Sequence, residues 1–208
     1  PSRLHRRWWG AGNLVSDDFS GPLSAKWDSY GSPPPRRRTD TGNPAPCFDN
    51  NGDASYDSGA ISKMRFDYTN GLVIESDLYV RGDPGGCWVG ATIGILKSFD
   101  YGDSRSPKRA VYFGHAYSGQ MCASKAEGVI RCLILKDDGT SEEHQVTHFN
   151  DYLGGWHRFK IVIDPTRHVH FYIDDQLFYE TEGQLSLAYT NMPLELGNRS
   201  SRYGDALH

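Results

Sequence analysis

The segment from Gly155 to Gly183, GWHRFKIVIDPTRHVHFYIDDQLFYETEG, constrains the fold of this chain more than any other. Apolar side chains recur at every second position in two successive runs of this segment. Because neighbouring side chains of a β-strand point to opposite faces of its sheet, this period predicts two strands that each have one apolar face. The residues of that face are Phe159, Ile161, Ile163, Val169, Phe171 and Ile173.

Two short turns separate the strands of this segment. The first contains Asp164 and Pro165, and proline suits a turn because its ring fixes φ. The second contains Asp174 and Asp175, which tolerate the positive φ of a two-residue hairpin better than most residues do. The segment therefore predicts an antiparallel meander with one polar face. That face carries Arg158, Lys160, His170 and Tyr172.

The rest of the chain repeats this pattern of short strands and turns. GLVIESDLYVRG alternates in the same way, and CWVGATIGIL, AVYFGHAY and VIRCLILK read as further strands. About nine or ten such segments follow one another at short intervals, without the alternation of strands and helices that a parallel sheet needs. The 23 glycines also favour many turns. We therefore expect an all-β protein, a two-sheet antiparallel β-sandwich.

Three pieces of the chain resemble the concanavalin A-like superfamily of legume lectins, laminin-G-like modules and many glucanases. GWHRFKIVIDPTRHVHFYIDDQLFYE resembles the penultimate hairpins of these jelly rolls, and DDFSGPLSAKW resembles their opening. GLVIESDLYVRGDPGGCWVGATIGI resembles their strand pair over the concave sheet. The resemblance implies a jelly-roll domain over residues 13–208, with one more strand expected after YGDALH, and leaves residues 1–12 as an N-terminal arm or linker.

Carbohydrate binding is the function that the resemblance and the residue types favour, although this fold hosts many activities. Sugars stack their C–H faces on Trp and Tyr, while carboxylates and Arg hydrogen-bond their hydroxyls. We expect the working surface on GLVIESDLYV, CWVGATIGI and AVYFGHAY, with the meander as scaffold. The expected carbohydrate-binding residues are Glu75, Asp77, Tyr79, Trp88, Tyr112, His115 and Tyr117.

Glycoside hydrolysis on this fold is a first alternative, and it needs two carboxylates. Retaining glucanases of the superfamily carry Glu-x-Asp-x-x-Glu on one strand. The segment ESDLYV begins with Glu75 and Asp77 but has no third glutamate. A solvated sheet face is the simpler interpretation of these two acids.

A polysaccharide lyase is a second alternative, because lyases on this fold use Tyr and His as acid and base near an Arg. Tyr112, His115 and Tyr117, with Arg109 or Arg131, supply those residue types. A laminin-G-like structural or protein-interaction module is a third alternative.

The resemblance also implies a structural Ca²⁺ that joins the first turn to the last strand. Asp205 matches the expected ligand and Asp18 lies in the first turn. A separate candidate is DNNGDASYD, residues 49–57, in which oxygen-bearing side chains stand at every second position. The alternative for all of these residues is the ordinary turn-forming role of Asp and Asn.

The four cysteines, Cys47, Cys87, Cys122 and Cys132, include no CxxC pair. Cys122 and Cys132 flank a segment that reads as a hairpin tip, so a disulfide there is expected, with Cys47–Cys87 as the second bridge. Four cysteines permit three pairings, and the sequence does not choose among them. Disulfides would indicate an extracellular, periplasmic or cell-surface protein, whereas four buried free thiols would suit a cytosolic one.

The charge balance limits the partners of this chain. A formal net charge of −4 argues against a general nucleic-acid binder, which normally carries a basic stripe. No run of about 18 apolar residues occurs, so no membrane span is expected. PPPRRR reads as part of a long surface loop in which Arg36, Arg37 and Arg38 would suit an acidic glycan or would simply be solvated.

These features together predict a lectin-like, carbohydrate-binding module of a larger secreted or surface protein, with an oligo- or polysaccharide as its partner. A polysaccharide-degrading enzyme and a laminin-G-like interaction domain are the alternatives on the same fold.

Overall fold

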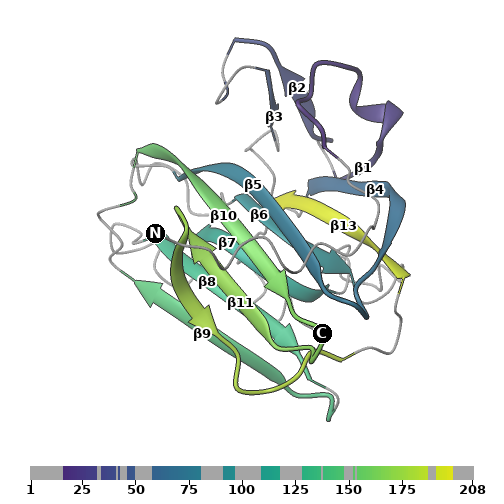
Figure 1. Cartoon of the computed structure of the whole chain (residues 1–208). Helices are drawn as coiled ribbons and strands as arrows, with labels where there is room; N and C mark the ends of the chain where they lie inside the picture. Colours follow the sequence, from purple (N-terminus) through teal and green to yellow (C-terminus); the bar gives the residue numbers. More distant parts are fainter. Residues whose placement is uncertain are drawn as a thin grey trace.

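Two antiparallel sheets pack face to face with apolar side chains between them (Figure 1). The computed structural model describes residues 16–31, 34–40, 42, 46–49, 58–80, 91–96, 109–117, 128–136, 138–147, 152, 154–186 and 191–198. The arrangement confirms the all-β, two-sheet antiparallel sandwich of jelly-roll type. The expected arm at residues 1–12 and the tail beyond Asn198 lie outside the described residues.

In the described part of the chain, the larger sheet contains seven strands in the order β1-β4-β13-β6-β7-β8-β9. The strands are β1 (Trp27–Tyr30), β4 (Ser58–Asp67), β6 (Ala91–Leu96), β7 (Arg109–Tyr117), β8 (Gly128–Leu135), β9 (Ser141–Thr147) and β13 (Asn191–Asn198). A 3₁₀ turn at Leu23–Ala25 precedes β1. Within the described ranges, no helix has the length and apolar character needed to cross a membrane.

The smaller sheet contains four strands in the order β12-β11-β10-β5 and lies in front of the larger one in Figure 1. Its strands are β5 (Leu72–Val80), β10 (Gly155–Ile163), β11 (Val169–Ile173) and β12 (Gln176–Glu180). A separate two-stranded ribbon, β2 (Arg36–Arg38) with β3 (Cys47–Asp49), stands at the top of the view.

The meander predicted from residues 155–183 is present as β10, β11 and β12. In the register, Phe159 lies opposite Ile173 and Ile163 lies opposite Val169. Asp174 and Asp175 have φ values of 51° and 64°, the left-handed conformation that a two-residue hairpin requires. The strands, their apolar face and the Asp-Asp turn are therefore confirmed.

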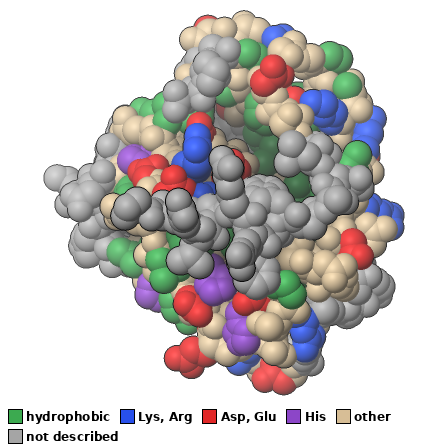
Figure 2. Space-filling model, in the orientation of Figure 1, with side chains coloured by type: hydrophobic (Ala, Val, Ile, Leu, Met, Phe, Trp, Pro, Cys, Tyr) green, Lys and Arg blue, Asp and Glu red, His purple; other side chains and the backbone are tan. Residues whose placement is uncertain are grey.

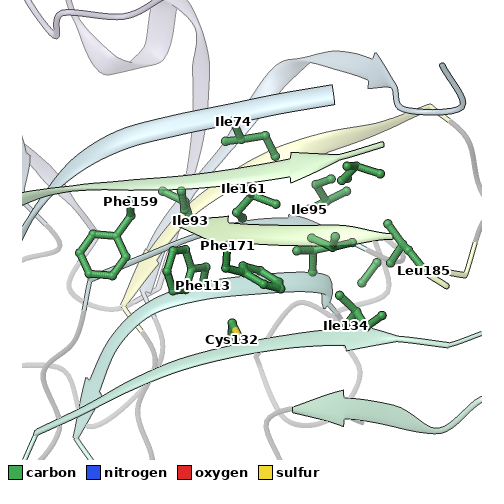
Figure 3. Close-up of a cluster of buried hydrophobic side chains, with 14 of the residues drawn as sticks. Ile74, Ile93, Ile95, Phe113, Cys132, Ile134, Phe159, Ile161, Phe171 and Leu185 are labelled. Carbon is green, nitrogen blue, oxygen red and sulfur yellow. The ribbon is translucent and has the colours of Figure 1, made fainter. Parts of the chain in front are cut away.

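Aromatic rings join the two sheets across the core. Phe113 of β7 meets Phe159 of β10 and Phe171 of β11 edge to face, with ring centroids 4.9 and 5.1 Å apart. Figure 3 shows these rings among aliphatic side chains from strands of both sheets. The apolar face of the meander is thus buried in the core, and its polar face points away from the larger sheet.

The expected pairing of GLVIESDLYV with CWVGATIGI was wrong. The first of these segments is β5, which pairs with β10 in the smaller sheet, and the second contains β6, which lies between β13 and β7 in the larger sheet. The chain crosses from one sheet to the other between these strands, so they belong to different sheets and do not pair.

The three arginines of PPPRRR lie on β2 and not in an irregular loop, which corrects that expectation. Arg36 Nε donates to Asp49 Oδ2 of the facing strand over 3.1 Å. Arg38 donates to both carboxylate oxygens of Asp40, and Arg37 Nε donates to the carbonyl of Phe19. The ribbon forms because β3 supplies a paired strand and a carboxylate opposite the basic run.

Cys47 and Cys132 are free thiols, which corrects the expected bridges through these two residues. Cys132 lies on β8 with its side chain fully buried in the core, opposite Phe113 in the register, and not at an accessible hairpin tip. Burial raises the pKa of both thiols, and most strongly that of Cys132. Cys87 and Cys122 lie outside the described residues.

Candidate functional site

The register of β5 against β10 lines up polar and aromatic partners on the outer face of the smaller sheet. Glu75 lies opposite Lys160, and Asp77 lies opposite Arg158. The apolar side chains that alternate with these, Ile74, Leu78, Phe159 and Ile161, are buried in the core. The outer face of the smaller sheet, which points away from the core, therefore carries a ladder of opposite charges.

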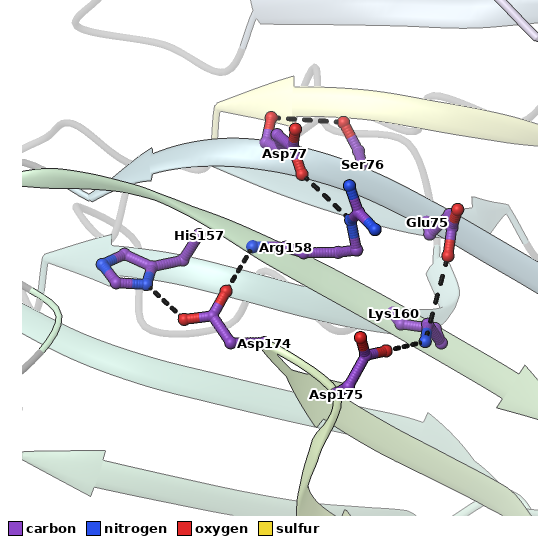
Figure 4. Close-up of polar contacts among 8 residues, drawn as sticks. All are labelled: Glu75, Ser76, Asp77, His157, Arg158, Lys160, Asp174 and Asp175. Atoms are coloured by element: carbon purple, nitrogen blue, oxygen red, sulfur yellow. Dashed lines mark hydrogen bonds and ion pairs between the residues drawn. The ribbon is translucent and has the colours of Figure 1, made fainter. Parts of the chain in front are cut away.

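The Asp174-Asp175 turn folds over this ladder. Asp174 Oδ1 accepts a hydrogen bond from Arg158 N over 2.9 Å, and its Oδ2 lies 2.6 Å from Nδ1 of His157. Asp175 contacts the Lys160 ammonium, which also lies 4.0 Å from Glu75. Figure 4 shows the turn carboxylates facing the side chains of β10 from one side while β5 faces them from the other.

An open pocket of about 300 Å³ lies between these elements. Its described lining residues are Asp77, Trp156, Arg158, Asp174 and Asp175. In the space-filling view, acidic and basic side chains gather on this face of the molecule, over the region of β5 and β10 (Figure 2). The volume falls at the lower end of the range found for ligand pockets.

Two pKa shifts describe the electrostatics of the pocket. Partial burial raises the pKa of Asp174, but hydrogen bonds from His157 and from the Arg158 amide outweigh it, so the carboxyl has a pKa below its ordinary value. The hydrogen bond and the charge of Asp77 raise the pKa of Arg158. The pocket thus holds these groups as carboxylate and guanidinium at neutral pH.

Two aromatic rings extend the pocket. Tyr79 lies opposite Trp156 in the register, and their ring centroids are 5.5 Å apart at an interplanar angle of 61°. Tyr79 is 44% exposed, so part of its ring faces the solvent. An exposed aromatic surface therefore adjoins the charged groups.

The structure brings together three of the expected binding residues, Glu75, Asp77 and Tyr79, all on β5. It separates them from Tyr112 and His115, which lie on β7 of the other sheet and are 0% and 1% exposed. The single binding surface expected on these strands is therefore wrong. Trp88 and the side chain of Tyr117 lie outside the described residues.

Of the acid and base candidates expected for a lyase, Tyr112 and His115 do not converge, while the side chain of Tyr117 lies outside the described residues. Tyr112 and His115 are an odd number of residues apart on β7, so they point to opposite faces of the larger sheet. Arg131 of β8 pairs with Glu143 of β9. The side chain of Arg109 is outside the described residues.

Four of the five described lining residues were not among the predicted binding residues, because the meander was expected to be scaffold. Trp156 and Arg158 stand on β10, and Asp174 and Asp175 form the turn. The signal that could have identified them was the polar face of the meander. Along β10 that face begins with an aromatic residue, Trp156, and continues with Arg158 and Lys160.

The calcium ligands expected at the first turn are only partly described. Asp18 Oδ1 accepts a hydrogen bond from Ser20 N over 3.0 Å, which holds the pKa of Asp18 below its ordinary value. The neighbouring Asp17 carboxylate binds the Trp27 indole N–H. Among the described residues no three potential ligands cluster around a metal-sized site. Asp205 and residues 50–57 lie outside the described ranges, so the calcium sites stay predictions.

Comparison with solved structures gives the class of this fold, the concanavalin A-like jelly roll. The metal-free carbohydrate recognition domain of Emp46p superposes with a TM-score of 0.54 at 13% identity, covering 90% of this chain and 87% of that chain. LamAcat from Zobellia galactanivorans gives 0.50 at 16% identity, over 92% of this chain and 89% of that chain. BuGH16Bwt superposes with a TM-score of 0.50 at 14% identity, covering 93% of this chain and 84% of that chain.

Neither protein-family models nor curated protein sequences match this chain. At the identities found among solved structures, the likeness extends to the fold and not to the residues of a site. The resemblance expected from the sequence is therefore confirmed at the level of the fold.

Proposed function

We propose that this chain is a lectin-like module that binds an oligo- or polysaccharide in the pocket between β5, β10 and the β11–β12 turn. The observation that carries the proposal is the exposed ring of Tyr79 against Trp156, directly beside the Asp77–Arg158 pair. An open pocket that joins an aromatic surface to paired charges offers both kinds of contact that a sugar ring makes.

The chemistry of a sugar fits these groups. The C–H face of a pyranose ring packs on an aromatic ring, and its hydroxyls donate to carboxylates and accept from a guanidinium. Arg158 Nε donates to Asp77 Oδ1 over 3.3 Å, and the Arg158 side chain is 51% exposed. The pair therefore presents fixed donors and acceptors to a ligand without a change of backbone conformation.

The structural neighbours support a carbohydrate ligand in general terms. One of them is a carbohydrate recognition domain, that of Emp46p, on the same fold. At 13% identity this supports the class of ligand and says nothing about the residues that bind it.

Affinity electrophoresis in gels that contain β-glucan, mannan or galactan tests the proposal, followed by calorimetry on the best ligand. Tyr79→Ala is expected to weaken binding about two- to tenfold, because it removes one stacking surface. Leu177→Ala is the matched control, since Leu177 is an exposed apolar residue, 55% exposed, on the same sheet outside the pocket. Absence of binding to any glycan, or equal binding by the two variants, would overturn the proposal.

The same gels separate binding from turnover. A binding module leaves the polysaccharide intact and a hydrolase releases new reducing ends. A lyase cleaves uronate polymers, so a parallel gel that contains polygalacturonate would reveal it by unsaturated products. Release of either product at a rate that Tyr79→Ala lowers would replace the lectin-like role by an enzymatic one.

Two further proposals accompany this one. We place the module in a larger extracellular, periplasmic or cell-surface protein, which signal processing of the native gene product would test. We also propose a structural Ca²⁺ at Asp18 and Asp205. A rise in Tm with Ca²⁺, reversed by a chelator and absent in Asp205→Ala, is the expected result.

A further inference from the structure

The pocket and its surroundings carry more negative than positive charge. Three of its described lining residues are aspartates and one is an arginine. The next pair along the β5–β10 ladder adds one acid, Glu75, and one base, Lys160. The described groups around the pocket therefore comprise four carboxylates against two cations.

Both cations are already engaged by protein carboxylates. Arg158 pairs with Asp77 through Nε, and Lys160 contacts Asp175 and lies 4.0 Å from Glu75. An incoming carboxylate or sulfate would have to share each cation with an acid that the fold holds beside it. The attraction that an anionic sugar gains from Arg158 or Lys160 is therefore largely cancelled.

The carboxylates themselves face the solvent. The side chains of Glu75, Asp174 and Asp175 are 52%, 48% and 61% exposed. Their oxygens are therefore accessible as acceptors for sugar hydroxyls or for an ammonium group. An anionic sugar would meet their like charge at the mouth of the pocket.

The basic run of β2 does not reverse this balance, because each of its arginines is engaged by a neighbouring group of the fold. Arg36 and Arg38 pair with Asp49 and Asp40. Arg37 donates to a backbone carbonyl. The arginines of PPPRRR are therefore engaged in holding β2 to its neighbours.

We propose that the pocket selects glycans by charge: it accepts neutral sugars and sugars that carry free amino groups, and it rejects uronates and sulfated sugars. This inference rests on the proposed function, since it names the ligand class of the same site. The specificity resides in the acidic rim formed by Glu75, Asp174 and Asp175. The aromatic surface provides affinity that does not depend on charge.

The test compares one polymer before and after a change of charge. Affinity electrophoresis uses β-glucan, mannan or galactan, whichever binds best, and the same sample with part of its C6 hydroxyls oxidised to carboxylates. We expect the oxidised sample to bind at least about threefold more weakly near 0.02 M salt, and the difference to shrink near 0.5 M salt because exposed charges are then screened. Chitosan, which carries amino groups, is expected to bind more strongly at low salt than its acetylated counterpart.

A pair of variants locates the selectivity. Glu75→Gln removes one charge from the rim and is expected to raise the ratio of binding to the oxidised polymer over binding to the neutral polymer by roughly twofold. Glu180→Gln removes the same charge from β12, where the Glu180 carboxylate lies 3.7 Å from His170 and outside the pocket, and should have no effect.

Two outcomes would contradict the inference, and they are distinguishable. If polygalacturonate or the oxidised polymer binds as well as the neutral one, charge selection is wrong while the proposed function stands. If no polymer of any charge binds, the proposed function fails and the inference fails with it.

Discussion

Gly94 shows how little space a single residue of the larger sheet has. A Cβ atom at this position on β6 would lie 2.3 Å from the carbonyl oxygen of Val111 on β7. Gly94→Ala is therefore expected to lower the free energy of unfolding by about 1–3 kcal/mol or more, since backbone would have to move. Gly21→Ala is the control, because no atom lies within 4 Å of its added Cβ. Equal midpoints of urea unfolding for the two variants would refute this reading.

Tyr179 gives the protein a dependence on alkaline pH. Burial first, and then its hydrogen bond to Glu142, raise the pKa of Tyr179 from 10.0 to about 12. Because the folded state holds this proton more tightly, its stabilising contribution is complete below pH 10 and is lost as the pH rises towards 12. Tyr68, with a pKa of about 12 through burial, adds a loss of the same sign.

Tyr179→Phe tests this titration. The variant is expected to lose less stability than the native protein between about pH 10 and pH 12, as measured by urea midpoints across that window. The dependence of the urea midpoint on pH should become weaker but should not vanish, since Tyr68 still titrates. An unchanged slope would show that the phenol of Tyr179 is not the group that loses its proton.

Among the elements, the edge strands β9 and β12 are tied together by one carboxylate. Glu142 of β9 accepts hydrogen bonds from the Tyr179 hydroxyl over 2.9 Å and from the backbone N–H groups of Glu182 and Gly183 over 2.7 Å each. This contact closes one side of the sandwich, because β9 and β12 are end strands of the two sheets.

Glu142→Gln is expected to lower the free energy of unfolding by about 1–3 kcal/mol. The carboxylate accepts at both oxygens, whereas the amide of Gln has one oxygen that accepts and one NH₂ group that cannot. Glu180→Gln on β12 changes the charge equally but removes only an exposed pair with His170, so it should cost about 0–1 kcal/mol. Chemical denaturation measures both. A Glu142 variant as stable as the Glu180 variant would show that the contact does not hold the sheets.

The β11–β12 turn joins two strands through residues of positive φ, and it also supplies two carboxylates to the pocket. One variant separates these two roles. Replacing Asp174-Asp175 by Asn-Gly keeps two residues that adopt positive φ and removes both carboxylates from the pocket. We expect stability within about 1 kcal/mol of the native value and roughly tenfold weaker glycan binding. A folded variant with full affinity would exclude the turn from the site.

The elements differ in how far the sequence could predict them. The strands and the positive-φ turn of the meander were predictable, since alternation and turn chemistry are local properties. The assignment of β5 to the smaller sheet was not predictable, because no local sequence pattern shows that the chain crosses to the other sheet before β6. The pocket was not predictable either. The hydrogen bonds of Arg158 to Asp174 and to Asp77 join residues 16 and 81 positions apart, and only the final register brings these groups together.

At the scale of the whole molecule, the two sheets differ in where they place their polar and aromatic side chains. The larger sheet carries Tyr112 and His115 as buried side chains. The smaller sheet packs one face on the core and leaves the other with an aromatic pair and a charged pocket. A concanavalin A-like jelly roll thus displays its candidate ligand site on the outer face of its smaller sheet, where the meander itself supplies most of the described lining residues.

The central claim is that this outer face binds carbohydrate, and titration of the ¹⁵N-labelled protein with the best-binding glycan tests it most directly. We expect the amide signals of Asp77, Arg158 and Asp174 to shift in proportion to occupancy, while those of β6, β7 and β13 stay unchanged. Shifts confined to β6, β7 and β13 would contradict the claim and move the ligand site to the larger sheet.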